Sequence, residues 1–345
     1  FSNMKKNLFF VGIAAAAMLA SCSNDETVEM PQSKAISFNN AFVNNGTRSV
    51  VDPSFTKANL GSFAVYGFTQ NGQIFDGQSV TSSDEGETWT YTPPKYWIEG
   101  NTYTFAGIAP ANTPVSGETV SGNKVHMTVN FTNENGTTDL LYAAPGQVTA
   151  DEDFLDNIQP VNMTFNHQLS KVKFSFINAV GESYNIKVTN VKVTDAKKTG
   201  TLTIGETNEW SNQTGNAELD FGNVITEDDK DDNVAAIIAN GKEGETYNER
   251  LMIPMNNTGI YTVTFSVELF DGAVSTHTYN HEVTIQNVEL KPNFCYDFKA
   301  TLTAENITEP DDPTLQKIEF DVTDIEGWKD YQEETVNVPA TQVGE

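Results

Sequence analysis

"VNMTFNHQLSKVKFSF" (residues 161–176) contains two successive runs in which about every second side chain is apolar. Val161, Met163 and Phe165 belong to the first run, and Val172 and Phe174 belong to the second. Polar residues 166–168 separate them. A period of two is typical of β-strands, whose successive side chains point to opposite faces of a sheet. We therefore predict two strands here and place a domain boundary between residues 166 and 167.

The same alternation recurs along most of the chain beyond residue 30. It predicts strands at residues 36–42, 63–68, 103–107, 125–131, 186–193, 201–204, 234–239, 261–269, 283–285 and 294–298. Gly, Asn, Asp and Pro interrupt these runs, as turns require. No stretch of twelve residues has a clear apolar face of helical period. The prediction is therefore an all-β fold, built most simply from β-sandwiches.

Charge and composition exclude several classes of protein. The net charge of -27 and a pI near 4.3 argue against nucleic-acid binding, which depends on clustered Lys and Arg. An apolar content of 38% with 10% aromatic residues is too high for a disordered chain. Cys295 lies in the strand-like stretch 293–298 and is therefore predicted to be a small apolar packing residue. The composition indicates a folded, acidic, secreted protein.

Residues 4–21 are predicted to be a lipoprotein signal peptide. Two lysines precede the apolar run 7–20, which as a helix would span roughly 21 Å, less than the ~30 Å hydrocarbon layer. Leu19 to Cys22 (LASC) resembles a bacterial lipobox. The resemblance implies cleavage by lipoprotein signal peptidase, acylation of Cys22 and an anchor in the outer membrane. Residues 22–34 would then be an acidic linker.

A search for catalytic and metal-binding patterns finds none. His277 and His281 share one face of a predicted strand but would lie about 13 Å apart, too far to share one metal ion. The acidic stretch 227–233 lacks the residue order of an EF-hand and is predicted to be a solvated loop. We therefore predict no enzymatic activity, no metal and no cofactor.

An aromatic cluster, Trp89, Tyr91, Tyr96 and Trp97, could stack on a sugar. Its alternating pattern and the Pro93-Pro94 pair fit core or edge packing better.

Only two arginines occur in the chain, Arg48 and Arg250. Arg250 precedes the strand-like run 251–254, where the fold would shield it. Arg48 lies in "NNGTRSVVDP", a polar, glycine-containing stretch between two predicted strands. Loops of this kind are preferred sites of proteolysis. An arginine-specific protease is therefore expected to cut between Arg48 and Ser49.

Several segments in a fixed order resemble the fimbrillin family of the Bacteroidia, the subunits of lipoprotein-derived type V pili. They are the lipobox and the stretches "AISFNNAFVNNGTRSVVD", "FAVYGFT", "KYWIEGNTYTFAGIAP", "MTFNHQLSKVKFSF", "NFCYDFKATLTAENIT" and "FDVTDIEGW". The resemblance implies two transthyretin-like β-sandwich domains in tandem, at residues 35–166 and 167–330. It further implies that cleavage after an arginine frees the first strand, and that a C-terminal strand of another subunit fills the exposed groove.

Carried over to this chain, residues 35–48 form the removable first strand and its cleavage loop. The strand would present Ile36, Phe38 and Phe42 to the groove. The tail, residues 331–345, would donate the replacing strand. Its apolar residues alternate in the same way, although Pro339 weakens the match. They are Val336, Val338 and Ala340.

The function predicted from these features is a structural, adhesive subunit of a cell-surface pilus, assembled by protease-triggered donor-strand exchange. Its partners would be other pilus subunits, most simply copies of the same chain. A cleavable site together with a tail favours a stalk subunit. The alternative is a monomeric surface lipoprotein that binds carbohydrate, with Trp89, Trp97 or Trp328 as the stacking platform.

Overall fold

The computed structural model describes residues 34–43, 60–227, 232–307 and 318–327. Strands dominate these residues, and α2 (Glu152–Asp156) is a five-residue helix. Asp151 caps α2, because its carboxylate accepts a hydrogen bond from Phe154 N at 2.9 Å. None of the described helices is both long and apolar enough to cross a bilayer. The predicted all-β fold is confirmed.

The first sheet has β1 at one of its edges, parallel to β9, while the other neighbouring strands pair antiparallel. Its strands in spatial order are β1 (Phe38–Val43), β9 (Val161–His167), β7 (Leu141–Ala143), β4 (Thr102–Ala109), β2 (Ser62–Thr69) and β3 (Gly72–Thr81), and β8 (Val148–Thr149) pairs with β4. β9 would therefore keep its pairing with β7 if β1 left the sheet.

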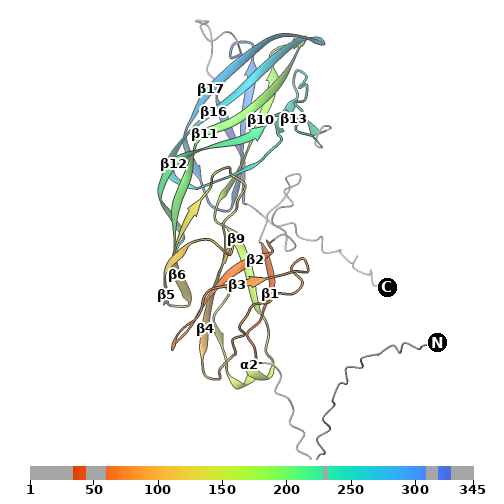
Figure 1. Cartoon of the computed structure of the whole chain (residues 1–345). Helices are drawn as coiled ribbons and strands as arrows, with labels where there is room; N and C mark the ends of the chain where they lie inside the picture. The colour runs from red at the N-terminus through yellow and green to blue at the C-terminus, as the bar shows by residue number, and fades with distance from the viewer. Residues whose placement is uncertain (1–33, 44–59, 228–231, 308–317, 328–345) are drawn as a thin grey trace, which may run out of the picture. The chain divides into compact units, whose positions relative to one another are not determined.

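The second and third sheets contain the remaining strands. In spatial order the second has β13 (Val224–Ile225), β14 (Glu243–Thr246), β10 (Ser170–Ala179), β18 (Phe294–Thr303) and β19 (Phe320–Gly327), and β15 (Arg250–Met252) pairs with β10. The third has β17 (Val274–Leu290), β16 (Met255–Asp271), β11 (Tyr184–Ile204), β6 (Lys124–Thr132) and β5 (Val115–Ser121), and β12 (Glu209–Gly222) pairs with β11. Figure 1 shows the long strands β11, β16 and β17 running side by side.

Three clusters of buried apolar side chains hold the sheets together. The first lies on one face of the first sheet and includes Val161, Met163 and Phe165 from β9. The second joins the opposite face of that sheet to β6 and β11. The third joins the second and third sheets through side chains such as Phe174 and Phe265. The alternation in residues 161–176 therefore corresponds to alternate burial, as predicted.

The chain passes from the first sheet to the second across Gln168 and Leu169, because β9 ends at His167 and β10 begins at Ser170. The third sheet contains strands from both sides of this point. β11 pairs with β16 through residues 184–193 and with β6 through residues 199–204. The division into two transthyretin-like domains remains a prediction.

Residues 186–193 and 201–204 are in strand conformation as predicted, but they form one continuous strand, β11, which stays paired with β12 across register shifts. One strand prediction was wrong. Residues 234–239 are not a strand, because their backbone makes only isolated pairings, such as the bridge between Ile238 and Ile186. Their alternation reflects burial of Ala236 and Ile238 alone, with Val234 and Ile237 exposed.

Candidate functional site

The first residues of the predicted removable strand lie between two other backbone segments. Ile36 N donates a hydrogen bond to Lys95 O at 2.8 Å, and Ala35 and Tyr96 form an antiparallel bridge. On the other side, Val161 N donates to Ser37 O at 2.8 Å. We call residues 35–43 the leader strand. Its first residues are therefore hydrogen-bonded to the segment around Lys95 and also to β9.

The rest of the leader strand is β1, which follows β9 as far as Val43. Phe38 pairs with Val161 in the parallel register, and Val43 pairs with Phe165. The register shifts between Asn39 and Phe42, so the two halves of β1 are offset by a bulge or irregularity. The leader strand is thus a parallel addition to the edge of a sheet that is otherwise antiparallel.

Phe38 is the principal side-chain anchor of the leader strand. It is 3% exposed, and its ring lies among four aromatic rings that we call the aromatic box. The ring centroids lie at 6.2 Å from Phe63, 5.7 Å from Phe75, 5.7 Å from Tyr91 and 5.9 Å from Phe105. Three of the contacts are edge-on, the arrangement that the ring quadrupole favours.

Tyr91 also binds the backbone of the leader strand. Its hydroxyl donates to Ile36 O at 2.8 Å and accepts from Lys95 N at 3.1 Å. Burial raises the pKa of Tyr91, so the phenol stays protonated and able to donate at neutral pH. Sequence reasoning placed Tyr91 among packing residues and missed this role, because the bonded residues are far apart in the chain.

The predicted site residues are placed as follows. Ile36 is buried and belongs to the first cluster together with Phe38. The backbone of Phe42 belongs to β1. The other predicted positions lie outside the described residues. They are Cys22, Arg48, Ser49, Trp328, Val336, Val338 and Ala340.

Of the remaining aromatic residues of the predicted cluster, the two tryptophans are buried, whereas Tyr96 is 55% exposed. Trp89 and Trp97 are 7% and 3% exposed, and both belong to the first cluster. Trp89 lies against Phe63, and Trp97 lies against Tyr103. Two of the three tryptophans offered for sugar stacking are therefore buried.

The histidines are spread over different environments. His167, predicted to lie in a polar separator, is buried at the end of β9 and forms a hydrogen-bonded pair with buried Asp139. His281 stacks on Phe265 with ring centroids 5.2 Å apart, and burial lowers its pKa. Over residues 34–43, 60–227, 232–307 and 318–327, no group of three His, Cys, Asp or Glu side chains could hold a metal ion.

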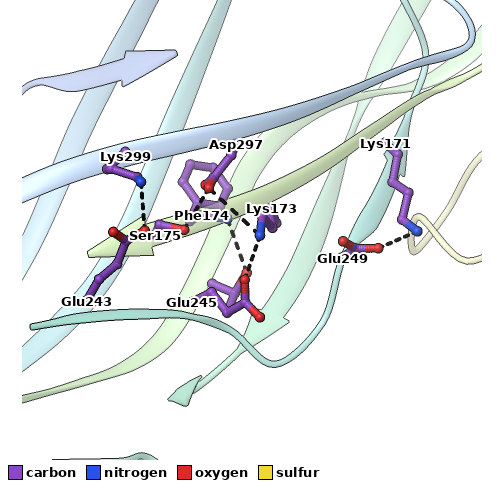
Figure 2. A network of polar contacts seen from close by, with 10 residues as sticks. Lys171, Lys173, Phe174, Ser175, Glu243, Glu245, Glu249, Asp297 and Lys299 are labelled. Atoms are coloured by element: carbon purple, nitrogen blue, oxygen red, sulfur yellow. Dashed lines mark hydrogen bonds and ion pairs between the residues drawn. The ribbon is translucent and has the colours of Figure 1, made fainter. Parts of the chain in front are cut away.

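A cluster of polar side chains lies on the second sheet and is drawn in Figure 2. Lys173 contacts Glu245 of β14 at 2.5 Å and Asp297 of β18 at 3.8 Å. Ser175 donates to Asp297 at 2.9 Å, so the cluster ties three strands together. A further pair joins Lys299 to Glu243 at 2.8 Å. Positive and negative groups alternate, which makes the cluster a cross-strand ion-pair ladder.

The ladder shifts the pKa of two of its members. Burial alone would lower the pKa of Lys173, but the hydrogen bond with Glu245 and the charge of Asp297 raise it overall. Burial raises the pKa of Asp297, although Lys173 and Ser175 oppose that effect. Lys173 is thus held as a cation between two acidic groups, an arrangement that serves strand pairing.

Comparison with known proteins assigns the family. The model of the fimbrillin-like family matches residues 47–328, which is most of the chain. The chain belongs to the fimbrillin-like family. Its family assigns this fimbrillin-like chain the role of a subunit of a cell-surface pilus. A search of the curated proteins gives no match.

Solved structures share the fold of this fimbrillin-like chain. A fimbrial protein from Bacteroides vulgatus is 16% identical with a TM-score of 0.60, over 86% of this chain and 99% of that one. A candidate cell adhesion protein from Bacteroides ovatus is 15% identical with a TM-score of 0.50, over 88% of this chain and 100% of that one. These likenesses indicate a common β architecture.

Proposed function

We propose that this pilus subunit polymerises by strand exchange, in which proteolysis after Arg48 frees the leader strand and a strand of another subunit takes its place. The observation that carries the proposal is the position of β1 at a sheet edge, with Phe38 buried in the aromatic box. An edge strand can leave without separating the strands that remain, whereas an inner strand cannot.

Loss of the leader strand would leave a groove that favours a new strand. The Lys95 carbonyl and the Val161 amide would lose their backbone partners, and each lost hydrogen bond contributes about 0.5–1.5 kcal/mol. Exposure of the box and of the site of Ile36 adds about 1.5–3 kcal/mol for each large apolar side chain no longer covered. Addition of a strand restores the hydrogen bonds and the apolar contacts together.

We further propose that Cys22 carries the lipid that anchors the precursor in the outer membrane, and that the cut separates this anchor from the polymerising part. The support is the lipobox-like sequence and the position of Arg48 between the leader strand and β2. Cleavage after Arg48 removes the lipid anchor and the covalent tether of the leader strand in one step.

Treatment of the purified precursor with an arginine-specific protease tests the proposal. Wild-type protein is expected to give a chain that begins at Ser49 and a ladder of oligomers by native mass spectrometry. Arg48→Lys keeps the charge but removes the cleavage site, so it should stay monomeric. Arg250→Lys is the matched control and should behave as wild type, since Arg250 lies in β15, paired with β10. Equal polymerisation of Arg48→Lys and wild type would refute the proposal.

A further inference from the structure

We propose that the aromatic box selects the strand that replaces the leader strand, and that the preferred strand carries an aromatic side chain two residues from an aliphatic one. A strand with this pattern is therefore expected to enter the groove in preference to residues 331–345 of this chain, which lack it. The inference rests on the strand exchange proposed above and names the partner class for the same groove.

The box fits an aromatic ring closely. Phe38 has ring neighbours on β2, β3, β4 and the loop that carries Tyr91, all at centroid distances between 5.7 and 6.2 Å. Aromatic pairs at these distances contribute about 0.5–1.5 kcal/mol beyond the area that they bury. An aliphatic side chain in the box makes none of these ring contacts and leaves part of the volume empty.

The walls of the box also contact one another. Phe75 lies 5.3 Å from Tyr91 and 6.1 Å from Phe105 between ring centroids. Gly67 lies behind two of these rings, and a Cβ there would lie 2.8 Å from Phe75 Cδ2 and 3.0 Å from Phe105 Cδ1. Because the rings support each other, the box cannot easily collapse around a smaller side chain.

The second element of the pattern is the position of Ile36. It lies two residues before Phe38, is 2% exposed and belongs to the same cluster, so both side chains enter the groove from one face of the strand. In the tail, Val336, Val338 and Ala340 have this spacing but include no aromatic residue. The aromatic residues beyond the described part, Trp328 and Tyr331, have no aliphatic residue two positions away.

The hydroxyl of Tyr91, unlike its ring, contributes affinity without selecting sequence. Its hydroxyl binds the carbonyl oxygen of Ile36, a group that almost any incoming strand supplies. The site thus combines a backbone contact common to all strands with a pocket that distinguishes them. The two contributions can be measured separately.

Competition between synthetic strands tests the inference on the full chain cut after Arg48. A fluorescent peptide with the sequence of residues 33–43 is allowed to enter the groove, and unlabelled peptides displace it while anisotropy is recorded. The competitors are the same peptide, its Phe38→Val variant, the tail peptide of residues 334–342 and the Val338→Phe variant of that tail.

We expect Phe38→Val to lower the affinity of the leader peptide for the groove about 30-fold. Val338→Phe should raise the affinity of the tail peptide by a similar factor. In Tyr91→Phe protein, every peptide should bind about fivefold more weakly, with the ratios between peptides unchanged. If both tail peptides compete equally, or the natural tail competes as well as the leader peptide, selection by the box is refuted while strand exchange stands. If the labelled leader peptide itself never enters the cut chain, strand exchange fails and the inference fails with it.

Discussion

Phe38→Ala in the uncut precursor should loosen the leader strand and leave most of the fold intact. A buried Phe→Ala change costs about 3–5 kcal/mol in a packed core. Phe38 is 3% exposed and has four ring neighbours, so its truncation should cost the docked leader strand an amount within this range. At 1.4 kcal/mol per factor of ten, the equilibrium for local opening of the leader strand should rise about 10²- to 10³-fold or more.

The loss of global stability should be smaller than this. Once the leader strand is detached, the rest of the chain no longer senses residue 38, so the global loss is limited by the free energy that docks the strand. Hydrogen exchange read by mass spectrometry separates the two effects. The amides of Ile36 and Val161 form the hydrogen bonds that join the leader strand to the segment around Lys95 and to β9. Their exchange rates should rise by the same factor as the equilibrium for local opening. Amides of β16 should not change.

Phe265→Ala provides the matched control. Phe265 is 2% exposed in β16 and packs on Phe176 at 5.0 Å between ring centroids. Its truncation should speed exchange in the third cluster and leave Ile36 protected. Unchanged exchange of Ile36 and Val161 in Phe38→Ala would refute the view that the box holds the strand.

Three further changes have defined outcomes. Gly67→Ala should cost about 1–3 kcal/mol in guanidinium unfolding, since the new Cβ would lie 2.8 Å from Phe75. His281 has a lowered pKa in the folded state, so the unfolded chain binds its proton more readily and stability should fall as pH drops below 6.5; His281→Gln should flatten that dependence in pH-dependent unfolding. Lys173→Met should cost about 1–3 kcal/mol in unfolding, and Asp297→Asn in the same chain should recover part of the loss.

Each of these changes has a matched control. Gly146→Ala meets no atom within 4 Å and should be nearly neutral. His277→Gln, at an exposed position, should leave the free energy of unfolding nearly as in wild type. Lys192→Met removes the exposed pair with Glu218 and should cost less than about 1 kcal/mol. Equal effects in a variant and its control would contradict the corresponding burial argument.

Most of the strand content followed from the sequence, because alternation of side chains is a local property of the chain. The runs around Val161 and Phe174 needed no tertiary information to be read as strands. The segment 234–239 shows the limit of that argument. Its alternation reflects the burial of side chains on one side only. A strand also needs a neighbouring backbone in register, and that depends on distant parts of the chain.

The candidate site was predictable in part. Burial of Ile36 and Phe38 followed from their spacing. The burial of His167 beside Asp139 did not, since its sequence neighbours are polar and its partner comes from a distant segment. The same holds for Tyr91, whose hydroxyl donates to the carbonyl oxygen of Ile36, 55 positions earlier in the chain.

By itself, the sequence of this protein determined that it is a β-protein, where most of its strands run and which of their faces are apolar. Only the tertiary structure decided that the leader strand lies parallel to β9 at a sheet edge, and that four rings from separate segments enclose Phe38. The physical reason is that side-chain period depends on neighbours along the chain, whereas pairing and enclosure depend on which distant segments meet.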